Sequence, residues 1–148
     1  MRLVIQRVAH ATCTVDNKLT GKADKGYMIL VGMGQDDDKS VVEKLALKVS
    51  KLRIFEDENG KMNLNIHDVN GNILSISQFT LYADASKGNR PSFVNALEPI
   101  KAKELYLYFN ECLRKEGISV EEGIFGADMK IDLLNDGPVT IILDSKDM

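Results

Sequence analysis

Cysteine and histidine are scarce in this chain. Its two cysteines, Cys13 and Cys112, and its two histidines, His10 and His67, are spread over about a hundred positions without a C-x-x-C pair. This spacing argues against a disulfide framework and against a structural zinc site. We therefore predict no metal and no cofactor, and we expect Cys13, in an alternating segment, to be a small residue of the core.

Long apolar runs are also absent. No run approaches the roughly 20 residues that a membrane-spanning helix needs. The segment 1–7 carries charge too early to be a signal peptide. Hydrophobic residues make up 44% of the 148 positions, which is enough for a packed core. We predict one domain over residues 1–148, located in the cytoplasm.

The chain has no excess of positive charge, since its formal net charge is −3. A nucleic-acid-binding protein usually has a basic excess, so the total argues mildly against one. The distribution is uneven, however. Residues 1–34 carry five basic and two acidic side chains, and residues 87–103 carry four basic and one acidic. Such local patches are compatible with phosphate contacts as well as with an ordinary solvated surface.

Hydrophobic spacing predicts a mixed α/β fold with two helices and a majority of strands. The run 27–31 is apolar throughout, as in a strand buried on both faces. Helical spacing predicts helices over 40–53 and 99–115, the first capped by Asp38. Glu98, before the second helix, is a poor N-cap residue. The predicted strands cover 3–8, 11–15, 27–31, 73–81, 119–121, 126–134 and 139–144.

Familiar catalytic signatures are missing: there is no G-x-S-x-G, no H-E-x-x-H and no phosphate-binding loop. One polar cluster, Ser77-Gln78-Phe79-Thr80, lies within the apolar stretch 73–81. If this stretch is a strand, Ser77 and Phe79 face one side, and Gln78 and Thr80 face the other. The cluster is consistent with an oxyanion hole built from backbone N–H groups, a glutamine amide and a threonine hydroxyl. The alternative is a strand that passes to an exposed edge, with its polar residues facing water.

A second unusual string, Asn135-Asp136-Gly137-Pro138-Val139-Thr140, lies between two apolar segments. Proline cannot donate to a β-ladder, and glycine allows another group to approach the backbone closely. The string alone favours a hairpin turn. The alternative is a shaped stretch of backbone that meets a ligand.

Together, the two strings resemble the signature motifs of the D-aminoacyl-tRNA deacylase family. Further segments agree in order over essentially the whole chain. These are Ile5-Gln6-Arg7-Val8, Arg53-Ile54-Phe55, Lys61-Met62-Asn63-Leu64-Asn65, Arg90-Pro91-Ser92-Phe93 and Phe125-Gly126-Ala127-Asp128-Met129. The resemblance implies a single domain of mixed, mostly antiparallel, barrel-like β-sheet with two main helices.

The resemblance also implies a function. Members of this family are homodimers with active sites at the interface, and they hydrolyse the ester of D-aminoacyl-tRNA, or of glycyl-tRNA(Ala). The 2′-hydroxyl of the substrate assists the attack. Their Gly-Pro peptide is cis, enters the partner's site and excludes L-amino acids, which makes Gly137 and Pro138 the expected specificity gate. The expected catalytic residues are Ser77, Gln78, Phe79 and Thr80.

The remaining expected site residues surround these. The resemblance implies that Arg7, Phe125, Met129, Asn135, Val139 and Thr140 form the pocket and support the gate. Lys87 and Arg90, in a loop rich in turn residues, are candidate contacts for tRNA phosphates. Two alternatives stay open: a non-catalytic tRNA-binding module of the same fold, and a generic small esterase, which the absence of a serine triad disfavours.

Overall fold

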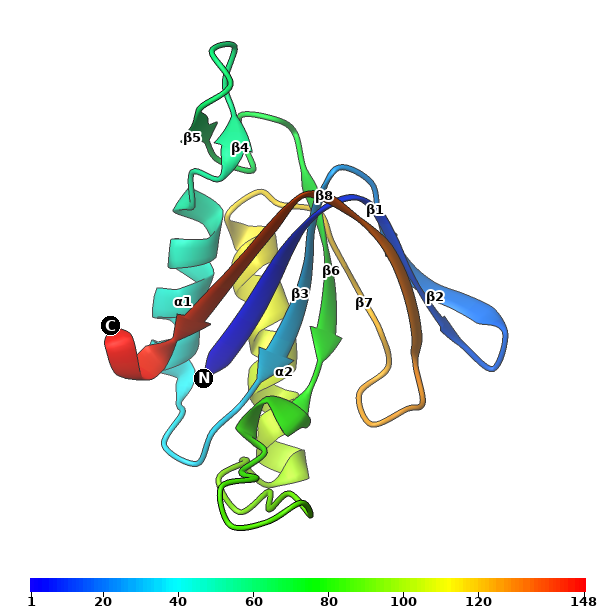
Figure 1. Ribbon diagram of the computed structural model, residues 1–148, viewed down its shortest axis with the longest axis vertical. Helices are drawn as coiled ribbons and strands as arrows, with labels where there is room; N and C mark the ends of the chain where they lie inside the picture. Colours follow the sequence, from blue (N-terminus) through cyan, green and yellow to red (C-terminus); the bar gives the residue numbers. More distant parts are fainter.

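The computed structural model describes residues 1–148, which form two α-helices and eight strands (Figure 1). The strands are β1 (Arg2–Val15), β2 (Lys18–Ala23), β3 (Gly26–Gly32), β4 (Phe55–Glu56), β5 (Met62–Leu64), β6 (Asn72–Ser77), β7 (Val120–Glu122) and β8 (Lys130–Asp144). The helices are α1 (Lys39–Lys51) and α2 (Pro99–Lys115), with 3₁₀ turns η1 (Phe79–Tyr82) and η2 (Ser145–Asp147).

The main sheet has six strands and is organised around β1. Along one edge β1 pairs antiparallel with β3 and β2, and along the other it pairs antiparallel with β8. β6 continues the sheet parallel to β3, and β7 lies parallel to β6. The sheet curls until β7 returns towards β2, where the N–H of Lys22 donates to Glu121 Oε1 at 3.2 Å. The result confirms the mixed α/β fold with two helices that the hydrophobic pattern predicts and the barrel-like sheet that the resemblance implies.

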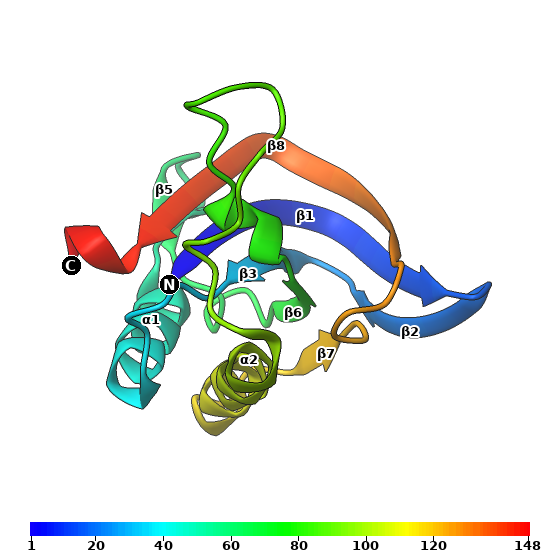
Figure 2. The ribbon, with the colours of Figure 1, turned by 90° about the horizontal axis from the view of Figure 1, so that it is seen from below.

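Two cores lie on opposite faces of this sheet. Figure 2 shows both helices on one face, where they pack over alternate residues of β1 and β3 such as Ile5, Tyr27 and Ile29. The other face holds a smaller core that includes Met28, Leu74 and the buried Cys13. Because β3 contributes to both cores, the prediction of a strand buried on both faces is confirmed. Neither helix is long and apolar enough to cross a membrane.

The helix ends follow their capping residues. Asp38 caps α1 by accepting from the N–H of Val41 at 3.0 Å, as predicted. Glu98 also caps its helix, which corrects the expectation that it is a poor N-cap. Its carboxylate accepts from the N–H of Lys101 at 2.7 Å and of Ile100 at 3.0 Å. A carboxylate one methylene longer than that of aspartate can still reach the free N–H groups of the first turn.

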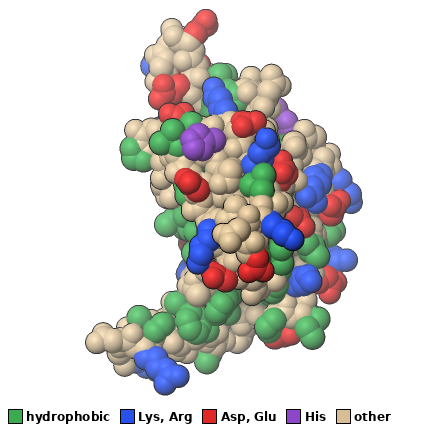
Figure 3. Space-filling view, turned by 90° about the vertical axis from the view of Figure 1, so that its right-hand side faces the viewer, with side chains coloured by type: hydrophobic (Ala, Val, Ile, Leu, Met, Phe, Trp, Pro, Cys, Tyr) green, Lys and Arg blue, Asp and Glu red, His purple; other side chains and the backbone are tan.

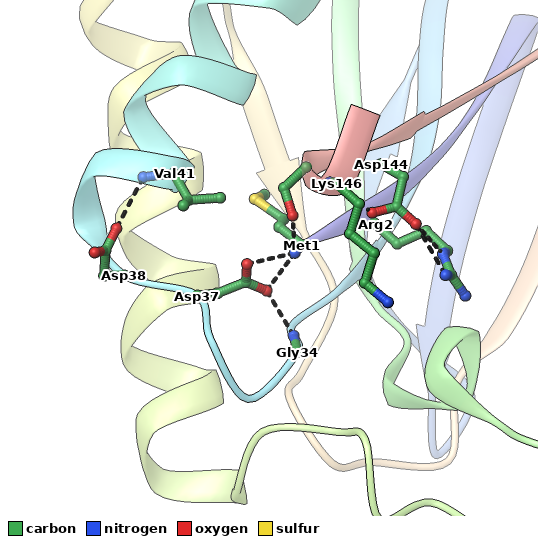
Figure 4. Close-up of polar contacts among 9 residues, drawn as sticks. Met1, Arg2, Gly34, Asp37, Asp38, Val41, Asp144 and Lys146 are labelled. Atoms are coloured by element: carbon green, nitrogen blue, oxygen red, sulfur yellow. Dashed lines mark hydrogen bonds and ion pairs between the residues drawn. The ribbon is translucent and has the colours of Figure 1, made fainter. Parts of the chain in front are cut away.

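The two ends of the chain meet beside α1 (Figure 4). The α-amino group of Met1 pairs with Asp37 and donates to Ser145 Oγ at 2.7 Å, and burial lowers the pKa of this amine. Arg2 pairs with Asp144 at 2.9 Å. A polar hollow of about 380 Å³ surrounds these groups, and it contains none of the predicted site residues. We therefore assign this hollow to the packing of the chain ends.

Three predicted strand boundaries are wrong. The segments 3–8 and 11–15 are one continuous strand, β1. The predicted strand 73–81 ends at Ser77, because the chain turns into η1. The segments 126–134 and 139–144 overlap a single strand, β8, which runs alongside β1 for almost its whole length. Gly137 and Pro138 therefore lie inside one strand and not in a hairpin.

Candidate active site

A largely apolar cavity of about 310 Å³ opens where β6 ends. Four segments that are distant in sequence contribute to it: the end of β3, the end of β6 with the start of η1, one face of α2, and the loop that leads into β8. The lining residues are Val31, Met33, Ile76, Ser77, Gln78, Phe79, Ala102, Tyr106, Phe125, Gly126, Ala127, Asp128, Met129 and Ile131. The cavity thus brings together five predicted site residues: Ser77, Gln78, Phe79, Phe125 and Met129.

The change from β6 to η1 sets the geometry of the polar cluster. The N–H of Gln78 donates to the carbonyl of Val31 at 2.7 Å, which completes the ladder between β6 and β3. After this bond the chain turns, so Ser77, Gln78 and Phe79 all line the cavity. The predicted alternation of faces is wrong, because it assumed an uninterrupted strand. Thr80 is exposed and not part of the lining, but its Oγ1 accepts from Gln78 Nε2 at 2.6 Å.

Tyr106 forms a wall of the cavity that sequence reasoning missed. Its ring lies 6.0 Å from the ring of Phe125, and its hydroxyl donates to the carbonyl of Ser75 at 2.7 Å. Burial raises the pKa of Tyr106 to about 12, so the hydroxyl stays protonated at neutral pH. The spacing of Ala102, Tyr106 and Phe109 at helical intervals was an available signal, because it places all three on the buried face of α2.

Gly123 sets how closely the loop before β8 packs on the strands. A Cβ atom built on Gly123 would lie 2.5 Å from Met129 Sδ and 3.2 Å from Ile76 Cδ1, and both of these side chains line the cavity. Only a residue without a side chain leaves room for Met129 in its present place. Gly123 therefore helps to determine the shape of the cavity without facing it.

Few titratable groups reach the cavity. Asp128 lines its edge, but its side chain is 85% exposed and pairs with Lys130 Nζ at 3.2 Å. Tyr106 is the other titratable group of the lining. No histidine or lysine lies in the lining, and no three His, Cys, Asp or Glu side chains are grouped to hold a metal ion. The cavity therefore offers hydrogen-bond donors and acceptors around an apolar floor, and few groups that could exchange a proton.

The predicted gate lies elsewhere on the chain, in a wide bulge of β8. Val8 pairs with Asn135 and Gln6 pairs with Thr140, so the four residues 136–139 stand opposite Arg7 alone. Gly137 and Pro138 are exposed, and the peptide bond between them is cis. The backbone on both sides of the bulge pairs with β1 in the same direction, which excludes the hairpin turn. Neither Gly137 nor Pro138 lines the cavity of its own chain.

Arg7 fills the space behind this bulge. Its side chain is 6% exposed, and its guanidinium donates to the carbonyl of Asp136 at 2.9 Å and to the carbonyl of Ile54 at 2.8 Å. Glu56 and the Asp136 carboxylate lie 3.8 and 3.9 Å away. Because residues 136–139 have no pairing partner in β1, the hydrogen bond from the guanidinium to Asp136 anchors this part of β8. A buried arginine thus ties the bulge to the segment before β4.

The other predicted residues lie at the margins of these two features. Asn135 and Thr140 bound the bulge, and Thr140 Oγ1 donates to Gln6 Oε1 at 2.5 Å. Val139 packs against the larger core. Lys87 and Arg90 are exposed in the loop between η1 and α2, which projects from the end of the molecule where β6 ends and α2 begins (Figure 1).

Sequence comparison gives a consistent result over nearly the whole chain. Residues 4–144 match the family model described as D-Tyr-tRNA(Tyr) deacylase. The chain is 58% identical to a D-aminoacyl-tRNA deacylase of Lactobacillus acidophilus, over 97% of this chain and 99% of that protein. It is 57% identical to a D-aminoacyl-tRNA deacylase of Deinococcus deserti, with the same coverage.

Solved structures share the fold. A structure titled c-Myc DNA Unwinding Element Binding Protein superimposes with a TM-score of 0.91 and 38% identity, covering 97% of this chain and 98% of that one. A second, described as a probable eukaryotic D-amino acid tRNA deacylase, superimposes with a TM-score of 0.83 over 96% of this chain and 97% of that one. The second is 17% identical, so it bears on the fold alone.

Proposed function

We propose that this chain, which belongs to the D-Tyr-tRNA(Tyr) deacylase family and hydrolyses the ester bond of D-aminoacyl-tRNA, selects D-amino acids with a site shared by two copies. In this site the cavity of one copy faces the bulge of the other. The observation that carries the proposal is the gathering of Ser77, Gln78 and Phe79 with Phe125 and Met129 around one cavity. We place the reaction in the cytoplasm. Glycyl-tRNA(Ala) is included in the proposed substrate range.

The reaction needs a nucleophile, a place for negative charge and a route for one proton. Water attacks the carbonyl carbon of the ester, and the carbonyl electrons move onto oxygen. When this intermediate collapses, the bond to the ribose 3′-oxygen breaks and that oxygen takes up a proton. The products are the free amino acid and tRNA. The first N–H groups of η1, those of Phe79 and Thr80, lack acceptors within the turn, which suits them to the developing oxyanion.

No side chain of the cavity is suited to act as the base. Tyr106 is protonated at neutral pH, and Asp128 is exposed and paired with Lys130. The Thr80 hydroxyl lacks a partner that would remove its proton, since it accepts a hydrogen bond from the side-chain amide of Gln78, which is a donor. We therefore propose that the 2′-hydroxyl of the substrate assists the attack, and that Gln78 orients the Thr80 hydroxyl as a further hydrogen-bond donor.

The proposed selectivity for D-amino acids depends on a rigid wall of the site. Apolar contacts alone discriminate between similar side chains by only about 1–3 kcal/mol. An L-amino acid, however, directs its side chain towards a different wall from that met by the D-hand. The backbone of Gly137 and Pro138, held by Arg7, would form that wall and clash with the L-hand. Glycine has no side chain to clash, so its ester would be accepted.

Two features support a second copy as the source of this wall. Within one chain, Gly137 and Pro138 do not line the cavity. β8 pairs with β1 only, so its outer edge is free, and exposed Leu134 and Ile142 lie along the same strand. A long free edge with apolar side chains favours association with another chain. We therefore propose a homodimer in which each cavity faces the partner's bulge.

The decisive test is hydrolysis of matched D- and L-aminoacyl-tRNA charged with the same amino acid. The proposal expects release of the D-amino acid and retention of the L-ester. Salt-sensitive tRNA binding with no hydrolysis would instead indicate a binding module. Hydrolysis of simple esters at a rate indifferent to tRNA would indicate a generic esterase.

The role of the substrate hydroxyl has its own test. A D-aminoacyl ester on the 3′-oxygen of a terminal 2′-deoxyadenosine keeps the scissile bond and removes the assisting group. We expect its turnover to fall by more than about a hundredfold, the usual scale of a lost acid–base function. Full retention of the rate would contradict substrate assistance.

A further inference from the structure

Two aromatic side chains lie exposed just outside the cavity. Phe79 is 55% exposed and Phe93 is 38% exposed, and their rings meet edge to face with centroids 5.1 Å apart. Val94, beside them, is 69% exposed. Phe79 also lines the cavity, whereas Phe93 does not. An apolar surface therefore continues from the cavity onto the loop between η1 and α2.

The base of this loop is held in place. Asp84 and Ser92 exchange two backbone hydrogen bonds of 2.8 Å across it. The N–H of Ala96 donates to the carbonyl of Phe93 at 3.0 Å, and the N–H of Leu97 donates to the carbonyl of Met33 at 3.0 Å. Phe93 is thus fixed by backbone hydrogen bonds on both sides. A ligand that stacks on it would not have to order the loop first.

The same loop carries uncompensated positive charge. Lys87 and Arg90 lie at its exposed tip, and neither forms an ion pair. The nearest carboxylates along the chain are engaged with backbone N–H groups: Asp84 accepts from Ser86, and Glu98 accepts from Ile100 and Lys101. Figure 3 shows Lys and Arg side chains on this projection and hydrophobic side chains gathered at its base.

We propose that the Phe79–Phe93 pair and the loop tip form a platform for the single-stranded nucleotides that precede the terminal nucleoside of the substrate. A base would stack on the exposed face of Phe93, and the phosphates would run towards Lys87 and Arg90. Exposed aromatic rings combined with basic residues are the usual means of binding single-stranded nucleic acid. The charge favours this occupant over an apolar surface of a second copy. The proposal rests on the function given above.

The test compares two substrates that share the ester: D-aminoacyl-adenosine and a trinucleotide that ends in the same D-aminoacyl-adenosine. The readout is the ratio of kcat/KM for the trinucleotide to kcat/KM for the nucleoside. We expect Phe93→Ala to lower this ratio about tenfold, the scale of one lost base–aromatic stack. Phe93→Tyr should restore it. Val94→Ala, which shortens an adjacent and more exposed side chain, should leave it close to the wild-type value.

The charges have a separate readout. Neutralising both Lys87 and Arg90 with alanine should lower the ratio and flatten its dependence on salt. The slope of log affinity against log salt should decrease by about 1.4 for two lost phosphate contacts on a single strand. An unchanged slope would mean that Lys87 and Arg90 do not contact the phosphates.

Three outcomes would overturn the platform. An equal loss on both substrates in Phe93→Ala would mean that Phe93 only supports Phe79. Dissociation of a dimer by Phe93→Ala would mean that the patch is a subunit contact. Equal affinity of the wild-type chain and Phe93→Ala for the trinucleotide without its aminoacyl group would directly exclude stacking on Phe93. This binding measurement does not require hydrolysis, so failure of the proposed function, seen as no turnover of either substrate, remains distinguishable.

Discussion

The cavity and the bulge of β8 are built in opposite ways. The cavity is concave, and side chains from four distant segments form its surface. The bulge is exposed, and at Gly137 and Pro138 it presents backbone with little side chain. A surface of side chains can adjust by rotamer changes, whereas a tethered backbone cannot. The contrast suggests that the cavity accommodates the substrate and the bulge rejects the wrong one.

The groups that support the two surfaces also differ, in that those behind the cavity are neutral and the one behind the bulge is charged. Behind the cavity, neutral hydrogen bonds such as that from Tyr106 to Ser75 hold the wall. Behind the bulge, one buried cation, Arg7, holds two carbonyl oxygens of different segments. Charged hydrogen bonds are stronger than neutral ones, and their loss leaves polar groups without partners. Changes at the bulge should therefore have larger effects than equivalent changes at the cavity wall.

The largest effect is expected from Gly137→Val. At φ of +135° a Cβ atom would lie 2.9 Å from Val139 Cγ2 and 3.1 Å from the Arg7 guanidinium, so a side chain disturbs both the exposed backbone and its support. We expect the ratio of D- to L-aminoacyl-tRNA hydrolysis to fall by about a hundredfold. Gly60→Val is the control, because Gly60 also has positive φ but nothing within 4 Å. An unchanged ratio in Gly137→Val would contradict the gate.

Arg7→Met should have the next largest effect. Methionine keeps much of the volume but cannot donate to the carbonyls of Asp136 and Ile54. We expect a loss of about 2–3 kcal/mol in the free energy of unfolding, together with reduced D/L discrimination. Arg53→Met is the matched control, since Arg53 donates to one carbonyl, that of Asn63, on the exposed surface. Equal losses in the two variants would show that the bulge needs no buried support.

Thr80 separates two chemical roles. If its hydroxyl is only a hydrogen-bond donor, Thr80→Ala and Thr80→Val should lower kcat by about tenfold and by less than the roughly thousandfold cost of a lost oxyanion-hole donor. Single-turnover rates on D-aminoacyl-tRNA measure this directly. A loss beyond about a thousandfold, with an intact circular dichroism spectrum, would instead assign Thr80 as nucleophile or base.

The smallest effect is expected at the cavity wall. Tyr106→Phe keeps the ring and removes the hydrogen bond to the carbonyl of Ser75, which still accepts from the N–H of Gly123 at 3.3 Å. We expect a loss of about 1 kcal/mol in the free energy of unfolding and a change in KM of only a few fold. Tyr108→Phe is the control, because the hydroxyl of Tyr108 bonds Glu43 on the exposed side of α2. A loss of discrimination in Tyr106→Phe would erase the contrast between the two regions.

Local chemistry made part of the fold predictable. The bounds of α2, the Asp38 cap and the doubly buried β3 follow from helical spacing, a capping residue and an apolar run. The turn at Ser77 was not predictable in this way, because the ladder bond from Gln78 to Val31 that precedes it depends on a strand far away in sequence. The bulge was not predictable from the local sequence for a similar reason. Glycine and proline indicate a break in a strand, but only the pairing of both flanks with β1 distinguishes a bulge from a hairpin.

The candidate site also contains residues that the sequence predicted and residues that it did not. Its polar members, Ser77 and Gln78, were visible because polar residues are costly in an apolar strand. Tyr106 and Gly123 were missed, since an aromatic residue on a buried helix face and a glycine in a loop are ordinary features of packing. Their importance arises from contacts with Phe125 and Met129, which the sequence does not record.

The central claim, that cavity and bulge from different chains form one site, can be tested with mixed dimers. One chain carries Ala127→Trp, which blocks its cavity, and the other carries Gly137→Val, which spoils its bulge. In the purified mixed dimer all activity comes from the single intact cavity. Our account predicts wild-type D/L discrimination, because that cavity faces the intact bulge of its partner. Discrimination as poor as that of the Gly137→Val homodimer would contradict it, because the bulge would then act on the cavity of its own chain.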